Sequence, residues 1–209
     1  MKRLVTCVFV LAAAAWPSGS ASAQSVGASG YVSFGAMRFA ASESFEIVTG
    51  SASKSGFGVG GTLTRLWRGV FADVSFWQHK PEGERVFVDG GTSFPLGIPV
   101  TITLRPVDVI GGWKFETGAV HPYVGGGVTF MSYEEKSDFS TAADDVSERK
   151  TGGVVLAGVD VPLGRLVRVG GEFRYRAVSG VLGEGGVSDV LGEDQLGGAV
   201  FAVRASVGR

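Results

Sequence analysis

The chain has 209 residues, of which 34 are glycine, 44% are hydrophobic and 11% are aromatic, and its formal net charge is −1. The apolar fraction is too high for a disordered chain, and the charges are too evenly balanced for a nucleic-acid-binding protein, which needs a clustered basic face. After the first residues there is no continuous apolar helix of membrane length. Any membrane insertion is therefore expected to use a closed barrel of strands.

The beginning of the chain is typical of a secretory signal peptide. A basic start is followed by an apolar run from Leu4 to Trp16 and by small residues before Gln24. The run is shorter than the roughly 20 residues that a membrane-spanning helix needs. We expect residues 1–23 to be cleaved and residues 24–209 to form one domain. Cys7 is the only cysteine, so the mature chain is expected to have no disulfide and no cysteine metal site.

Eight segments that alternate apolar and polar residues follow, separated in turn by long and short gaps. An up-and-down barrel with tight turns at one rim and large loops at the other has this rhythm. The predicted fold is all-β, an eight-stranded antiparallel up-and-down transmembrane β-barrel. Its strands are expected near residues 26–40, 55–66, 69–79, 99–116, 120–132, 151–162, 166–178 and 195–207.

The alternation also predicts which side chains face the interior. In the seventh segment, apolar residues alternate with Arg168, Glu172, Arg174 and Arg176. This pattern indicates a strand whose two faces have different surroundings, one apolar and one polar. Soluble lipocalin-type barrels have the opposite pattern, with an apolar lumen. Because eight strands leave a lumen that side chains fill, we expect an ion-pair network there and disfavour an open channel. The predicted network has four acidic and five basic residues: Asp73, Asp108, Lys114, Asp160, Arg168, Glu172, Arg174, Arg176 and Arg204.

The fourth segment changes phase, because its apolar residues switch from even to odd positions after Arg105 and Pro106. Proline cannot donate to a strand ladder, so a β-bulge is predicted there. The first segment does not alternate cleanly, and its faces stay unassigned. Residues 85–91 are expected to form a small hairpin or rim extension.

Aromatic residues gather near both ends of the predicted strands, as in the two aromatic bands of a membrane barrel. The predicted membrane-interface aromatics are Trp67, Phe76, Trp113, Tyr123, Phe130, Tyr133 and Tyr175.

The charges of the gaps predict an orientation. In the four long loops, at residues 41–54, 80–96, 133–150 and 179–195, acidic residues outnumber basic ones by 1, 1, 3 and 4. The short turns and the C-terminus carry Arg65, Arg68, Arg165 and Arg209 instead. We expect the long acidic loops to face outside. Loose binding of divalent cations by these loops stays open, since any solvated acidic loop has the same composition.

No catalytic, cofactor-binding or metal-binding residue is predicted. Residues 56–61 match G-x-G-x-x-G, but another strand follows where a dinucleotide site needs a helix, so these glycines are expected to fit a crowded barrel interior. His79 is expected at the extracellular rim and His121 at a short turn. Ser75 lies too far along the strand from His79 for a nucleophile–base pair, whereas Ser132 on another strand stays open as a partner.

Two stretches resemble the small outer-membrane β-barrel family of the OmpA and OmpX type. Residues 121–128, HPYVGGGV, resemble the family's PYxGxGxG strand start, and residues 171–176, GEFRYR, resemble its penultimate strand. The chain departs from the family in ending Val207-Gly208-Arg209, where members often have an aromatic residue that the barrel-assembly machinery recognises.

The resemblance implies a non-enzymatic protein of the outer membrane of a Gram-negative-type cell, with a role in envelope integrity or in surface binding through its loops. The expected partners are outer-membrane lipids and lipopolysaccharide and the barrel-assembly machinery, with no nucleic acid, no cofactor and a monomeric state. Three alternatives stay open: a narrow pore or transporter for small solutes, a lipid A-modifying barrel enzyme and, more weakly, a soluble ligand-carrying barrel.

Overall fold

A computed structural model describes residues 26–89, 92–116, 118–137, 146–180 and 187–209. The expected signal peptide lies outside these residues, as do parts of the second, third and fourth long loops. Within them, no helix is long and apolar enough to span a membrane.

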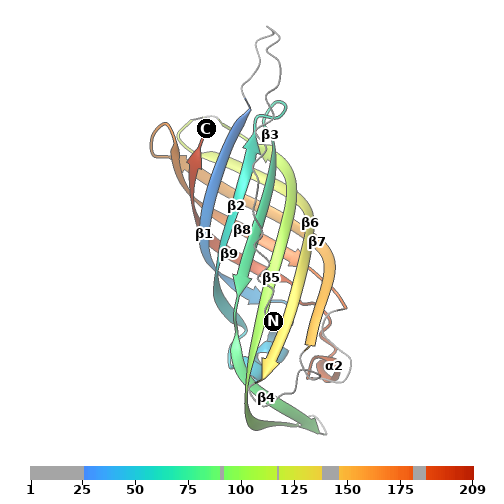
Figure 1. The fold of residues 1–209 in the computed structure, drawn as a ribbon. Helices are drawn as coiled ribbons and strands as arrows, with labels where there is room; N and C mark the ends of the chain where they lie inside the picture. Colours follow the sequence, from blue (N-terminus) through green and yellow to red (C-terminus); the bar gives the residue numbers. More distant parts are fainter. Residues whose placement is uncertain (1–25, 90–91, 117, 138–145, 181–186) are drawn as a thin grey trace, which may run out of the picture.

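Eight tilted antiparallel strands form a closed barrel (Figure 1). Each barrel strand pairs with the next along the chain, and the last strand pairs with the first, so the sheet has no open seam. The all-β, eight-stranded antiparallel fold predicted from the sequence is confirmed. The barrel strands are β1 (Gly27–Phe39), β2 (Ser53–Thr64), β3 (Val70–His79), β5 (Thr92–Lys114), β6 (His121–Ser137), β7 (Val146–Pro162), β8 (Val167–Ala177) and β9 (Gly198–Gly208).

Three of the strands are longer than the sequence pattern predicts. β5, β6 and β7 extend past the barrel at the long-loop end, where Glu135 still pairs with Val146. Beyond Tyr133, the described side chains of these extensions are exposed or half-buried, so the apolar alternation that marks the other strands is missing. A ninth strand, β4 (Glu82–Asp89), pairs with the first part of β5. This hairpin agrees with the rim extension predicted at residues 85–91, of which residues 90 and 91 lie outside the described residues.

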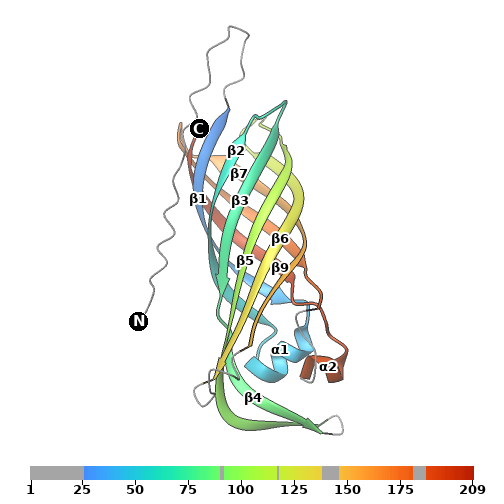
Figure 2. The same cartoon turned by 45° about the vertical axis from the view of Figure 1, so that its right-hand side comes forward.

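Two short helices, which the sequence analysis did not predict, lie side by side at the long-loop end, with β4 beyond them (Figure 2). They are α1 (Ser42–Thr49) in the first long loop and α2 (Val187–Leu191) in the fourth. Phe45 and Val48 place apolar side chains three positions apart, and Gly50 ends α1 in the left-handed conformation. These are ordinary helix signals, but they are spread over only two turns.

The alternation of inward and outward residues is unbroken through β5. The β5–β6 register runs without a shift from Val100 to Lys114, so the bulge predicted at Arg105 and Pro106 is wrong. Even-numbered residues point inward on both sides of Pro106, with Ile102 and Leu104 before it and Asp108 after it. The inward-facing side chains change from apolar to charged at this level of the barrel. In the sequence, that change has the same pattern as a shift of the apolar residues from one face of the strand to the other.

The outward-facing residues form an apolar belt around the barrel. On β1, Val32 and Phe34 are exposed while Tyr31 and Met37 point inward, which settles the faces of that strand. Phe201 and Val203 on β9 are exposed by 65% and 69%. An apolar surface that surrounds a whole barrel has no favourable contact with water, whereas lipid chains match it.

Candidate functional site

Six charged side chains meet in the middle of the barrel and are buried there. We call this group the central ion cluster: Asp73, Asp108, Glu172, Arg174, Arg176 and Arg204. Three carboxylates face three guanidinium groups, so the charges cancel.

Arg174 joins the cluster across the barrel. Its Nε donates to Oε1 of Glu172 at 2.5 Å, and its Nη1 donates to Oδ2 of Asp108 at 2.9 Å and to the Ser75 hydroxyl. Its Nη2 lies 3.4 Å from Oδ1 of Asp73 and donates to the Tyr31 hydroxyl at 3.1 Å. One fully buried side chain on β8 therefore contacts strands on the opposite side of the barrel.

Arg176 and Arg204 complete the charge balance. Arg176 donates twice to Asp108, with Nη2 2.7 Å from Oδ2 and Nε 3.0 Å from Oδ1. Arg204 donates from Nη1 to Oε2 of Glu172 at 3.1 Å, and its guanidinium lies over the Tyr31 ring at 3.5 Å. Planar guanidinium groups suit such forked and stacked contacts better than ammonium groups do.

The remaining charged residues predicted for the interior lie nearer the short-turn end. Lys114 and Asp160 are both buried and form a separate ion pair. Arg168 is only partly buried, and its Nη2 donates to the carbonyl oxygen of Gly208 at 3.2 Å, away from the carboxylates. The structure thus brings eight of the nine predicted residues into two ion-paired groups, and without Arg168 the interior charges are equal in number.

The sequence analysis missed the uncharged members of the cluster. The Tyr31 hydroxyl donates to Asp73 at 2.9 Å, and the Thr62 hydroxyl donates to the other oxygen of Asp73 at 2.7 Å. The sequence does contain one indication that Tyr31 faces inward. Tyr31 pairs directly with Gly60, whose missing side chain leaves room for the tyrosine ring.

Glycines of β2 make the interior wide enough for large side chains of the neighbouring strands. A Cβ atom on Gly56 would lie 2.3 Å from Nδ1 of His79, and one on Gly58 would lie 2.5 Å from Cε2 of Trp77. The G-x-G-x-x-G stretch is therefore a packing device on a strand, as the sequence predicted, and strand β3 follows it.

Above the central ion cluster, the barrel is closed by an apolar plug at the long-loop end. Phe45 of α1 stacks on Phe39 of β1 with the ring centres 3.8 Å apart, so the first long loop folds into the mouth. The sequence predicted a charged lumen and did not predict this apolar layer. The plug consists of Met37, Phe39, Ala41, Phe45, Trp77, Ile102, Leu104, Met131, Tyr133, Val178, Leu196, Val200 and Ala202.

His79 is fully buried beside the plug, and its ring stacks on Trp77 at 5.9 Å. His79 therefore lies at the long-loop end of β3, where the sequence predicted it, but its ring is buried inside the barrel and not exposed at the rim. Neither ring nitrogen bonds to a serine or carboxylate side chain among the described residues. Ser132 points to the outer wall, on the opposite face from His79, so the two cannot form the nucleophile–base pair left open from the sequence.

The predicted interface aromatics divide between the two faces of the wall. Tyr123 and Tyr133 are buried in the interior, where Tyr123 donates to Glu172 at 3.2 Å and Tyr133 donates to Glu135 at 2.7 Å, so their prediction is wrong. Odd-numbered residues of β6 face inward. The sequence prediction was based on the position of the two tyrosines near the ends of the strand and did not consider which face they occupy. The other five lie on the outer side of the barrel: Trp67 and Trp113 at the short-turn end, and Phe76, Phe130 and Tyr175 toward the long-loop end.

The first and fourth long loops are joined by one carboxylate. Ala41 precedes α1 and offers no side-chain cap, and the Glu193 carboxylate instead accepts from the backbone N–H groups of Ser44 at 2.8 Å and Glu43 at 3.2 Å. Partial burial alone would raise the pKa of Glu193, but the donors on Ser44 and Glu43 outweigh it and lower that pKa. The helix N-terminus also favours a negative charge.

This contact predicts a pH dependence of the rim. Because the pKa of Glu193 is lowered from its ordinary value of 4.5, the contact is complete at neutral pH and is lost as the pH falls through the lowered pKa. We expect the amide proton shift of Ser44 to titrate with a midpoint below 4.5 in NMR spectra of the micelle-bound protein. Glu193→Gln should abolish the titration and the neighbouring Asp194→Asn should keep it. An unchanged Ser44 titration in Glu193→Gln would contradict the contact.

The closed barrel, its apolar belt and its charged interior define a class of fold, the small eight-stranded β-barrel of outer-membrane proteins. Solved structures of that class are similar to this chain over most of its length. No protein-family model matches the chain, and no curated protein matches it in sequence.

Three solved structures represent the likeness. Ail of Yersinia pestis, the attachment invasion locus protein solved with the heparin analogue sucrose octasulfate, has a TM-score of 0.53 at 14% identity, over 88% of this chain and 99% of Ail. Neisserial surface protein A has a TM-score of 0.53 at 14% identity, over 87% and 96%. A major outer membrane protein of Thermus thermophilus has a TM-score of 0.52 at 12% identity, over 87% and 99%. At these identities the likeness concerns the fold.

Proposed function

We propose that the chain is a non-enzymatic outer-membrane β-barrel that presents a folded rim of loops outside a Gram-negative-type cell. The observation that carries the proposal is the contrast between the two faces of one wall. The outer face is an apolar belt, and the inner face holds a neutral ion cluster below an apolar plug. Such a barrel is stable only where lipid or detergent covers its outer face.

The filled interior favours a structural or surface-presenting role over a pore. Trp77, Leu104, Arg174, Arg176 and Met131 have at most 1% of their surface exposed. A water-filled channel would leave side chains of the lumen accessible to water. Buried charges of a lumen are tolerated because they pair, and here they have no excess of one sign that would select ions.

The arrangement of polar groups supports a non-enzymatic role. His79 is fully buried on the inner face with its ring against Trp77, while Ser75 accepts from Arg174 within the central ion cluster. General-base chemistry requires a base within hydrogen-bond reach of a group that substrate can also reach. Neither residue meets that requirement.

The rim is the part of the molecule suited to contact other molecules. α1, α2 and the β4–β5 hairpin lie together beyond the barrel, at the end where the long acidic loops gather (Figure 2). Membrane barrels of this type have their longer loops on the extracellular side. We therefore place the rim outside the cell and the short turns in the periplasm.

Cysteine labelling on intact cells tests this orientation. We expect Ser188→Cys, in α2, to react with a membrane-impermeant maleimide on intact cells, because α2 lies on the extracellular rim. Leu163→Cys, in an exposed short turn, should react only after the outer membrane is permeabilised. The wild-type chain is the blank, since its only cysteine is Cys7 in the expected leader. Labelling of Leu163→Cys alone on intact cells would contradict the proposed orientation.

A further inference from the structure

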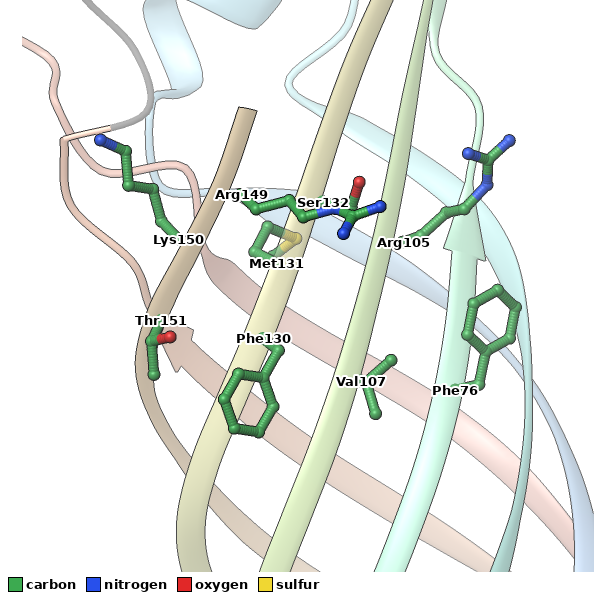
Figure 3. Close-up of a pocket in the computed structure, with 9 residues that line it drawn as sticks. All are labelled: Phe76, Arg105, Val107, Phe130, Met131, Ser132, Arg149, Lys150 and Thr151. Atoms are coloured by element: carbon green, nitrogen blue, oxygen red, sulfur yellow. The ribbon is translucent and has the colours of Figure 1, made fainter. Parts of the chain in front are cut away.

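An open pocket of about 500 Å³ lies against the outer wall, where the apolar belt meets the long-loop end (Figure 3). It spans four neighbouring strands, β3, β5, β6 and β7. The residues that line it are Phe76, Arg105, Val107, Phe130, Met131, Ser132, Arg149, Lys150 and Thr151.

The pocket has an apolar floor and a cationic upper edge, each set by strand register. Phe76, Val107 and Phe130 pair side by side in one row of the sheet. One outward position nearer the rim, Arg105 and Arg149 pair on either side of Ser132. Figure 3 shows the Arg149 side chain lying across β6 beside Ser132. Two guanidinium groups and a hydroxyl therefore stand directly above three lipid-facing apolar side chains.

The charges at the upper edge are in positive excess. Glu134 accepts from Arg105 at 2.9 Å and from Lys136 at 2.7 Å, and Lys150 lies 3.9 Å from Glu148. Arg149 has no ion pair with a described residue. Among the described residues of this edge, four cations (Arg105, Lys136, Arg149 and Lys150) stand against the two carboxylates of Glu134 and Glu148, an excess of two positive charges.

We infer that this pocket binds a phosphate group of an acylated, phosphorylated glycolipid of the lipid A type from the outer leaflet. The phosphate lies between Arg105 and Arg149 with the Ser132 hydroxyl as a third donor, and an acyl chain lies on the floor below. The strands that carry the two arginines are about 10 Å apart across β6, a span that two long side chains close around one anion. The site rests on the proposed function, because only a barrel embedded in the outer membrane brings its floor against acyl chains.

The surroundings favour a lipid over a soluble polyanion as the occupant. A soluble sulfated glycan would approach through the long loops, which carry nine more acidic than basic residues in total and would repel it. A lipid reaches the pocket sideways, along the belt. Phe76, Val107 and Phe130 are also the contacts that an acyl chain needs and a soluble anion does not use.

Native mass spectrometry of the folded protein in zwitterionic micelles tests the site. The probe is bis-phosphorylated lipid A, compared with the same lipid after enzymatic removal of its phosphates. We expect Arg105→Gln with Arg149→Gln to weaken retention of lipid A by about tenfold or more, since two charge-assisted contacts are lost. The matched control is Arg165→Gln with Arg209→Gln, which removes the same charge from exposed positions at the short-turn end and should retain lipid A like the wild type.

The possible outcomes distinguish a lipid A site from non-specific lipid binding and from a site for a soluble polyanion. Equal retention by the pocket variant and the control, or equal retention of the dephosphorylated lipid, would overturn the site. Arginine-dependent binding of sucrose octasulfate without binding of lipid A would assign the pocket to a soluble polyanion and also overturn it. Gel mobility of the same samples, unheated and heated, separates the two proposals. A compact band that disappears on heating supports the membrane barrel of the proposed function, even if the lipid site fails. Absence of that band rejects both proposals.

Discussion

Arg174→Met is expected to lower the free energy of unfolding by about 3–5 kcal/mol, because three buried carboxylates would then face only two guanidinium groups, those of Arg176 and Arg204. Glu172 and Asp108 would keep their charges in the interior, and the contact with Tyr31 would also be lost. Chemical unfolding of the purified protein in detergent micelles, followed by tryptophan fluorescence, measures the change.

Arg168→Met is the matched control for this variant. It removes the same kind of charge from the same strand, but Arg168 is partly buried, and its side chain bonds to a backbone carbonyl and to no carboxylate of a described residue. We expect it to change the free energy of unfolding by less than about 1 kcal/mol. Equal stability of the Arg174 and Arg168 variants would show that the central ion cluster does not hold the barrel together.

Gly58→Ala is expected to destabilise the barrel by about 1–3 kcal/mol through overpacking. The new Cβ atom would lie 2.5 Å from the Trp77 ring, which is itself fully buried in the apolar plug. The same unfolding experiment measures the effect.

Two further variants identify the cause. Gly61→Ala on the same strand points outward and meets no atom closer than 3.7 Å, so it should fold like the wild type. Combining Gly58→Ala with Trp77→Leu should cost less than the sum of the two single changes, since the smaller side chain yields the space. If the two glycine variants were equally stable, the proposed role of Gly58 would be wrong.

The outer wall of the barrel could be predicted from the sequence with few errors. The belt is made of one class of side chain at every second position, as in Val203, Ala205 and Val207 of β9, so the period of two is easy to detect. The interior carries two classes of side chain in separate layers. The change from Leu104 to Asp108 within β5 therefore imitated a bulge that does not exist.

The charged members of the interior could also be predicted, because few physical reasons place an arginine such as Arg174 on a membrane strand unless it faces inward. Which charges meet could not be predicted, since the pairs depend on the tilt of the barrel. Arg168 has the same parity as Arg174 and yet lies too near the short-turn end to contact the central ion cluster.

The rim could be predicted least. The contact between Glu193 and Ser44 joins residues 149 positions apart, and it replaces the side-chain cap that Ala41 cannot supply. Neither local propensity nor strand alternation contains that information. The cationic pocket could not be predicted for the same reason, because Arg105 and Arg149 become neighbours of Ser132 only through the register of three strands.

The central claim is that lipid surrounds this barrel and that its interior is closed. Fractionation of cells that express the full chain, followed by gel electrophoresis of heated and unheated samples in SDS, tests this claim most directly. We predict that the protein sediments with the outer membrane and that the unheated sample migrates faster than the heated one, because the paired barrel resists SDS until it is heated. Recovery as soluble periplasmic material, with the same mobility before and after heating, would contradict the account.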